Sequence, residues 1–205
     1  MLTIALPKGR IAKDTLEIFE KIFQKSFVFD DRKLILHVGD FRFLLVRNQD
    51  VPAYVLHQSA DVGVVGLDVL EEQESNLTRL LDLGVGKCRV CIGVPKIRKL
   101  DFSLPEIKIA TKMENITRKY FSSRAIPVNI IKLYGSIELA PLVGLADAIV
   151  DLVETGSTME QNGLEIAETI FCSSAHLVCN KNSFISKKEE ILALYTHIKN
   201  YILTK

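Results

Sequence analysis

The residues best suited to chemistry lie at the end of the short apolar segment 148–153 and directly after it. They comprise two acids, a glycine and three hydroxyl residues: Asp151, Glu154, Thr155, Gly156, Ser157 and Thr158. A loop of this composition between a strand and a helix can direct backbone N–H groups and hydroxyls at one anion. The two carboxylates stand where they can accept hydrogen bonds from sugar hydroxyls. The pattern favours a phosphorylated sugar as ligand, and the alternative is an ordinary turn with a Ser or Thr helix cap.

Gly156 has a specific expected role in this loop. A residue without a Cβ lets the backbone approach a phosphate where any side chain would clash. We therefore expect residues 155–158 to form a phosphate cradle, with the ribose held by the acids before it.

A basic loop near the N-terminus provides a second set of candidates. Residues 2–6 are apolar, and Lys8, Gly9 and Arg10 follow them directly. Apolar residues then recur at helical spacing from Ile11 to about Gln24. Open α/β sheets bind ligands at the carboxyl ends of their strands, so Lys8 and Arg10 are candidates for an anion contact. The alternative is two solvated charges in a turn.

Two further strand-like segments end in residues that could face the same ligand. Arg47 closes the segment 43–47, and Gly66 closes the segment 61–66. Asp68 lies shortly after Gly66, and its spacing to Glu71 resembles a capping box. We expect Asp68 to cap a helix rather than act as a catalytic acid, although it lies at a ligand-facing strand end.

The elements that must position these residues alternate between strand-like and helical patterns, which predicts an α/β fold. We expect two α/β lobes with a ligand cleft between them. Lobe I would comprise residues 1–86 and about 171–205, and lobe II would comprise residues 87–170, with the loop 151–159. Ser186 is expected to cap the last helix.

Composition restricts the class of protein. The 205 residues carry 26 basic and 25 acidic side chains, and 48% are hydrophobic, which predicts a folded core without a nucleic-acid-binding face. No apolar run approaches the ~20 residues that span a bilayer, and the N-terminus does not resemble a signal peptide. Cys88 and Cys91 lie in a strand-like run, so we expect reduced, packed cysteines rather than a metal site or a disulfide. A soluble cytoplasmic protein without membrane contact is predicted.

One long segment carries a family resemblance. Residues 144–159, with Glu138 before them, closely resemble the signature of the ATP phosphoribosyltransferases, which catalyse the first step of histidine biosynthesis. Residues 4–10, 50–52, 60–63, 66–68 and 109–112 also resemble that family, in the family's order. The resemblance therefore covers nearly the whole chain.

This resemblance implies a fold similar to type II periplasmic binding proteins and a defined reaction. ATP and phosphoribosyl pyrophosphate would give N1-(5-phosphoribosyl)-ATP and pyrophosphate, with Mg²⁺ carried mainly by the substrate's pyrophosphate. Residues 155–158 would hold the 5-phosphate, with Asp151 and Glu154 on the ribose. The basic residues Lys8, Arg10 and Arg47 would contact pyrophosphate or triphosphate, and Lys8, Arg10 and Asp151 are the expected catalytic residues.

The length of the chain implies the short form of this family, without a C-terminal regulatory domain. Enzymes of that form resemble one another in needing a regulatory subunit related to histidyl-tRNA synthetase. We therefore expect a dimer of catalytic chains within a hetero-oligomer, with little activity and no histidine feedback from the chain alone. Two alternatives remain, a non-catalytic binding module for a phosphorylated ligand and a catalytic fragment of a long-form enzyme.

Overall fold

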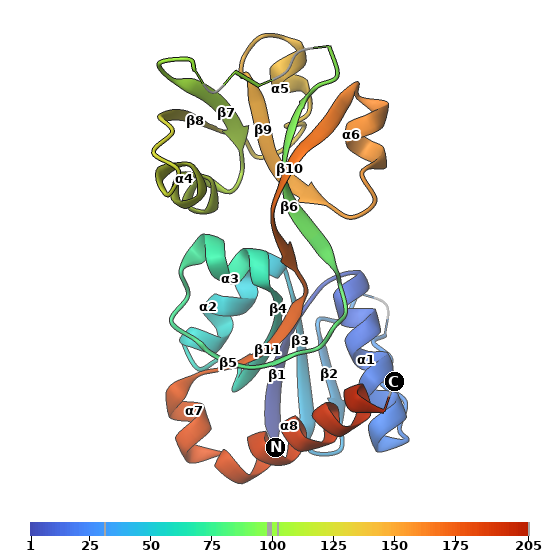
Figure 1. Ribbon diagram of the computed structural model, residues 1–205. Helices are drawn as coiled ribbons and strands as arrows, with labels where there is room; N and C mark the ends of the chain where they lie inside the picture. The colour runs from blue at the N-terminus through green and yellow to red at the C-terminus, as the bar shows by residue number, and fades with distance from the viewer. Residues whose placement is uncertain (31, 98–99, 102, 205) are drawn as a thin grey trace. The chain divides into compact units, whose positions relative to one another are not determined.

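The computed structural model describes residues 1–30, 32–97, 100–101 and 103–204, which form two α/β units (Figure 1). The first unit comprises Met1–Leu70, Glu74–Gly86 and Ser174–Lys205, and the second comprises Glu71–Gln73 and Lys87–Ser173. The chain thus leaves the first unit after Gly86 and returns to it after Ser173. The cleft expected between two lobes stays a prediction.

The first unit is built on a six-stranded sheet with the order β2-β3-β1-β4-β11-β5. Its parallel centre consists of β1 (Leu2–Pro7), β3 (Phe41–Val46) and β4 (Val62–Gly66). The strands β2 (Ile35–Val38), β11 (Ala175–Cys179) and β5 (Thr78–Asp82) join by antiparallel pairing. All residues of β1 and β4 are buried, as expected for strands covered on both faces.

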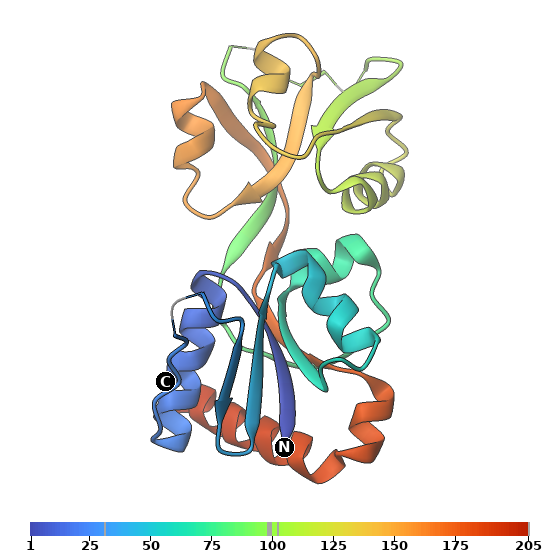
Figure 2. The same ribbon diagram turned by 180° about the vertical axis from the view of Figure 1, so that it is seen from behind.

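Helices cover both faces of this sheet, as Figures 1 and 2 show from opposite sides. Ile4 and Leu6 of β1 belong to the core shared with α1 (Arg10–Phe23) and α8 (Lys188–Leu203). The intervening Ala5 belongs to a separate core with α2 (Val51–Leu56) and α3 (Leu67–Gln73). Alternate residues of a strand point to opposite faces, so one continuous apolar strand supplies both cores. The short helices η1 (Asn48–Asp50) and α7 (Lys181–Ser186) connect these elements.

The second unit has a five-stranded sheet with the order β10-β6-β9-β7-β8. The strands β7 (Ile107–Thr111), β8 (Val128–Lys132) and β9 (Ala148–Val153) run parallel to one another. The strands β6 (Cys88–Pro95) and β10 (Leu164–Ser173) pair antiparallel. One core lies under α4 (Glu114–Ser122), and another lies under α5 (Leu139–Leu142) and α6 (Ser157–Gln161).

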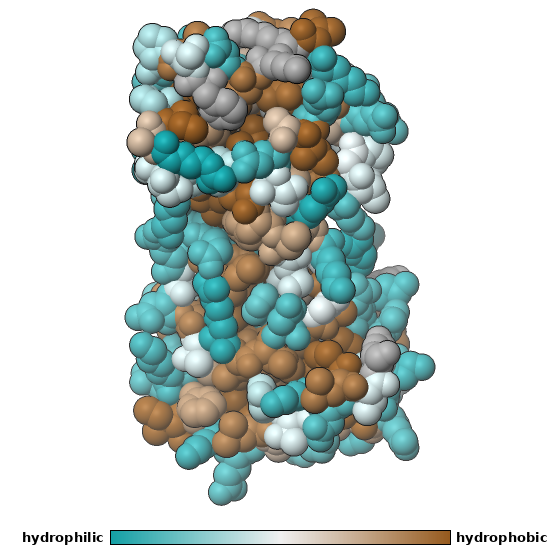
Figure 3. Space-filling model, viewed as in Figure 1, coloured by the Kyte–Doolittle hydropathy of each residue, from teal (hydrophilic) through white to brown (hydrophobic). Residues whose placement is uncertain are grey.

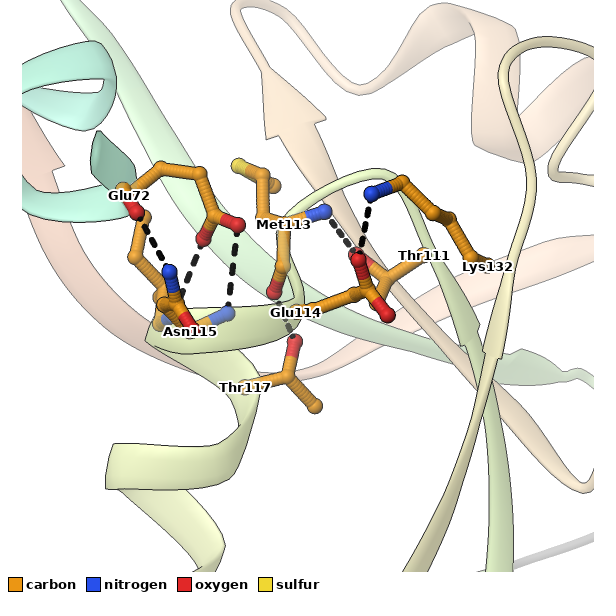
Figure 4. A network of polar contacts seen from close by, with 8 residues as sticks. Glu72, Thr111, Met113, Glu114, Asn115, Thr117 and Lys132 are labelled. Atoms are coloured by element: carbon orange, nitrogen blue, oxygen red, sulfur yellow. Dashed lines mark hydrogen bonds and ion pairs between the residues drawn. The ribbon is translucent and has the colours of Figure 1, made fainter.

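A polar network holds the N-terminus of α4 (Figure 4). The carboxylate of Glu72 accepts hydrogen bonds from the backbone N–H groups of Asn115, at 3.1 Å, and Ile116, at 3.0 Å. The Asn115 side-chain amide donates to the Glu72 carbonyl at 2.8 Å. Glu72 therefore satisfies first-turn donors that have no partner within the helix. Beside it, the Lys132 ammonium lies 2.6 Å from the Glu114 carboxylate.

Two predicted helix caps are wrong. The helix α3 begins at Leu67, with Gly66 at its cap position and no side-chain cap bond, so Asp68 is the second helical residue. Ser186 is the last residue of α7 rather than the cap of the final helix. The reason is Asn180, whose side chain accepts a hydrogen bond from the Asn182 N–H at 2.7 Å and starts the separate helix α7.

The surface mixes both kinds of side chain, and Figure 3 shows hydrophilic and hydrophobic residues interspersed on the viewed face. Some apolar exposure is normal for a folded protein. No helix within the described parts of the chain is both long and apolar enough to traverse a membrane.

Candidate functional site

A polar cavity of about 390 Å³ opens at the carboxyl end of β9 in the second unit. It is lined by Glu138 and by the continuous run from Asp151 to Met159. All six residues predicted for phosphoribosyl binding, Asp151, Glu154, Thr155, Gly156, Ser157 and Thr158, therefore lie in one cavity. Its volume lies within the range of small-molecule sites.

The backbone of the loop depends on Gly156, which has a φ of 93°. A Cβ at this position would lie 3.7 Å from the Ile166 side chain and 3.8 Å from that of Val153. These are ordinary contacts with protein atoms, and the close approach of a phosphate expected at this glycine stays a prediction. Glycine is favoured here because other residues rarely adopt a positive φ.

Hydroxyl groups of the loop contact each other. The Thr155 and Ser157 hydroxyl oxygens lie 3.0 Å apart, and the Ser157 N–H points at the Thr155 hydroxyl at 3.4 Å. The Thr158 carbonyl accepts a hydrogen bond from the Asn162 side chain at 2.8 Å. Thr155, Ser157 and Thr158 are all exposed, so the loop presents hydroxyl donors that can turn toward a bound anion.

Met159 anchors the loop to the sheet. Its side chain is 3% exposed and packs in the core with Ile149 and Leu164. A Cβ at Gly93 of β6 would lie 3.1 Å from the Met159 sulfur and 2.9 Å from Ile149. Because Gly93 has no side chain, Met159 can pack there and hold α6 against the sheet.

Asp151 is held by two neighbouring groups. Its Oδ1 lies 3.1 Å from the Lys112 ammonium, and the same oxygen accepts a hydrogen bond from the Leu152 N–H at 2.8 Å. The Asp151 side chain is 14% exposed. It is therefore a held carboxylate at the edge of a cavity rather than a solvated one.

The residues predicted in the first unit gather at one edge of its sheet. Lys8, Arg47 and Gly66 lie at or directly after the carboxyl ends of β1, β3 and β4, which are adjacent parallel strands. The Lys8 N–H donates to the Val46 carbonyl at 2.8 Å, which joins two of these ends. Lys8, Arg10 and Arg47 are all exposed, so three cations follow neighbouring strand ends.

Gly9 and Gly66 serve this edge in different ways. Gly9 precedes α1 with a φ of 102°, a conformation that glycine adopts without strain. Gly66 instead provides space, because a Cβ there would collide with the Asp68 carboxylate. Asp68 is 7% exposed, so it folds back over the strand end within the first turn of α3, where negative charge is favourable.

The structure adds two residues to which sequence reasoning gave no role. Glu138 lines the cavity beside the phosphate loop, and Lys112 pairs with Asp151. Both lie within segments that carry the family resemblance, at the start of 138–159 and at the end of 109–112. Within the described residues, no group of three His, Cys, Asp or Glu side chains is arranged to hold a metal ion.

The sequence model of the ATP phosphoribosyltransferase family matches residues 47–200. The chain belongs to this family. An ATP phosphoribosyltransferase from Campylobacter concisus is 69% identical over 202 residues, which is 98% of this chain and 99% of that protein. One from Helicobacter hepaticus is 60% identical over 205 residues and all of both chains. The chain is accordingly an ATP phosphoribosyltransferase, a pentosyltransferase of histidine biosynthesis.

Solved structures agree with the sequence relatives. A chain of the ATP phosphoribosyl transferase (HisG:HisZ) complex from Thermotoga maritima matches with a TM-score of 0.86 and 35% identity over all of both chains. The periplasmic aliphatic sulphonate binding protein from Escherichia coli matches with a TM-score of 0.62 and 12% identity, over 98% of this chain and 72% of that one. The second match shows the fold alone, and it confirms the predicted likeness to type II periplasmic binding proteins.

Proposed function

We propose that residues 151–158 hold the phosphoribosyl group while it passes from phosphoribosyl pyrophosphate to N1 of ATP. The observation that carries this assignment is the single cavity that contains both acids and all three loop hydroxyls. The hydroxyls and backbone N–H groups of residues 155–158 bind the 5-phosphate. Asp151 and Glu154 accept hydrogen bonds from the ribose hydroxyls.

The cations at the first sheet's edge serve the negatively charged groups. Lys8 and Arg10 contact the pyrophosphate that leaves, and Arg47 contacts pyrophosphate or the ATP triphosphate, with Gly9, Gly66 and Asp68 shaping the same edge. The oxygen donors of the cavity, Asp151 and Glu154 among them, suit a hard cation. Mg²⁺ bound to the substrate's pyrophosphate supplies charge neutralisation when the group leaves.

The reaction is a direct displacement at the anomeric carbon. Adenine N1 forms the new bond as the bond to pyrophosphate breaks, and both electrons of that bond leave with the pyrophosphate. Positive charge develops on the ribose, close to the carboxylates, and negative charge develops on the leaving group, close to the cations. Alignment and electrostatic stabilisation provide the rate enhancement, so no protein nucleophile is required.

The chain works with a second subunit in this proposal. The Thermotoga maritima chain matched over its whole length comes from a HisG:HisZ complex, and this supports a regulatory partner related to histidyl-tRNA synthetase. That hetero-oligomer would contain a dimer of catalytic chains. The four cysteines are free thiols, which suits the reducing cytoplasm, although Cys172 is exposed rather than packed.

The decisive experiment is an assay of pyrophosphate release with ATP, phosphoribosyl pyrophosphate and Mg²⁺. Each substrate is omitted in turn as a control, and the adenine absorbance is followed in the same samples. Pyrophosphate release that requires both substrates, with equimolar N1-substituted adenine product, supports the proposal. Binding of phosphoribosyl pyrophosphate without product, with and without the partner subunit, would instead identify a non-catalytic binding module.

A further inference from the structure

Lys112 occupies a position set by the pairing of two parallel strands. Thr111, the last residue of β7, is in register with Val150 of β9. Lys112, directly after β7, and Asp151, within β9, are the next residues along the two segments. The Lys112 ammonium lies 3.1 Å from Asp151 Oδ1. The ion pair thus joins two strand ends at the edge of the cavity.

The backbone around Lys112 is fixed on both sides. The buried Thr111 hydroxyl donates to the Val150 carbonyl at 2.7 Å. It accepts a hydrogen bond from the Met113 N–H at 2.9 Å (Figure 4). Met113 is itself 4% exposed. The backbone of Lys112 is therefore held next to β9 by the Thr111 hydrogen bonds and by the buried Met113. The fold itself places the Lys112 side chain within reach of Asp151.

The pair leaves the two oxygens of the Asp151 carboxylate in different situations. The Lys112 ammonium and the Leu152 N–H both bind Oδ1. Within the described residues, Oδ2 has no hydrogen-bond or ion-pair partner. A carboxylate held through one oxygen in this way presents the other to a ligand in a fixed direction.

The positive charge of Lys112 also offsets negative charge in the cavity. Three carboxylates, Glu138, Asp151 and Glu154, line the same space, and like charges repel when they are brought together. Lys112 offsets the charge of Asp151, with which it forms an ion pair at 3.1 Å. This keeps the Asp151 carboxylate in place beside its acidic neighbours.

We infer that Lys112 is a positioning residue that turns Asp151 so that Oδ2 accepts a hydrogen bond from a ribose hydroxyl of phosphoribosyl pyrophosphate. The inference rests on the proposed role of residues 151–158 and goes beyond it by assigning a residue outside that loop. Lys112 acts through Asp151 and not on the substrate.

The test uses four single variants and one double variant in the complex with the regulatory subunit. Lys112→Met keeps the length of the side chain without its charge, and Lys112→Arg restores the charge. Lys108→Met is the matched control, because Lys108 is an exposed lysine of β7, the strand that Lys112 directly follows. Asp151→Asn is measured alone and combined with Lys112→Met. The KM for each substrate, kcat, and calorimetric binding of phosphoribosyl pyrophosphate are measured for every protein.

We expect Lys112→Met to raise the KM and Kd for phosphoribosyl pyrophosphate about tenfold, with a change of less than about threefold in the KM for ATP. Lys112→Arg should recover most of this loss, and Lys108→Met should match the wild type. In the Asp151→Asn background, Lys112→Met should add less than about a twofold loss, because residues that act as a unit are not additive.

Three results would overturn the inference. One is Lys112→Met with wild-type constants, and another is a full additional loss in the Asp151→Asn background, which would mean that Lys112 meets the substrate itself. The third is equal loss for both substrates, as a merely structural role predicts. Inactivity of the wild-type complex is a separate outcome that refutes the proposed function, so the two failures are distinguishable.

Discussion

Asp151 is a carboxylate whose orientation is fixed, because Lys112 and the Leu152 N–H both bind its Oδ1. Asp151→Asn keeps the shape of the side chain and removes its charge. We expect a loss of about tenfold or more in kcat/KM, which corresponds to ~1.4 kcal/mol or more of transition-state stabilisation. Steady-state pyrophosphate release measures it. The control is Glu165→Gln, an exposed acid in the same unit, and equal rates for both variants would contradict the role given to Asp151.

Lys8 is the corresponding residue of the first unit, exposed directly after β1. Lys8→Ala removes one positive charge that would stabilise the departing pyrophosphate. Turnover should fall by about tenfold or more, again ~1.4 kcal/mol. Lys13→Ala is the comparison, because Lys13 is an exposed lysine in the first turns of the adjacent α1. A Lys8→Ala rate as high as that of Lys13→Ala would remove Lys8 from the site.

Residue types and local spacing indicated the loop and the cations, but they could not indicate the contacts between segments. Asp151 and the loop hydroxyls all lie within residues 151–158, so one strand and one turn are enough to bring them together. The Lys112–Asp151 pair depends instead on the alignment of β7 with β9, which no local pattern specifies. The positive φ of Gly156 was likewise not apparent from local sequence, and it favours glycine independently of any ligand.

At the scale of elements, the packing of α6 on β6 through Met159 and Gly93 links stability to substrate binding. Gly93→Val would place methyl groups against Ile149 and the Met159 sulfur, where even a Cβ comes within 2.9 and 3.1 Å. We expect a loss of about 1–3 kcal/mol in unfolding free energy from overpacking. The displaced loop should also raise the KM for phosphoribosyl pyrophosphate several-fold.

Urea unfolding and steady-state kinetics measure the two effects of Gly93→Val. Gly135→Val is the control, because no atom lies within 4 Å of a Cβ at Gly135. Destabilisation with an unchanged KM would show that α6 does not depend on this contact.

The helix α4 carries a test of stability against pH. Burial, and then the nearby Glu168 carboxylate, raise the pKa of Tyr120 to about 12 from 10.0. The folded state thus favours the protonated hydroxyl, and this stabilisation is present below pH 10 and is lost as the pH rises toward 12. Tyr120→Phe has no proton to lose, so its unfolding free energy should fall less over this range, by on the order of 1 kcal/mol. Parallel urea-midpoint curves for the two proteins would refute this.

The elements that the sequence predicted well are those with long uniform patterns. The strands β1 and β4 are buried throughout and mostly apolar, and α1 buries Ala12, Thr15, Ile18 and Phe19 at helical spacing. In contrast, β2 and β5 are short strands without a fully buried residue. Their pairing partners define them, so they could not be recognised from local composition.

For the whole molecule, fold and activity are separate conclusions. Binding proteins with 10–15% identity to this chain reach TM-scores of 0.60 to 0.62, so the arrangement of strands and helices alone does not specify a transferase. We propose that the acids and hydroxyls at the end of β9 and the cations after β1 and β3 make the difference. The same scaffold can therefore bind a ligand or transform it, depending on the residues at its strand ends.

Dependence on a regulatory subunit is the prediction that belongs to the whole molecule. If catalysis requires the hetero-oligomer, the purified chain should release pyrophosphate slowly, and adding the partner should raise kcat by about tenfold or more, which is ~1.4 kcal/mol. Histidine should inhibit only the mixture, because its effect must act through a coupling between the two subunits. Activity is measured while the partner is titrated into a fixed amount of the chain, with and without histidine, and an unrelated protein at equal concentration serves as control. Full activity of the chain alone would place catalysis within this one polypeptide. Inhibition of the isolated chain by histidine would place feedback there as well.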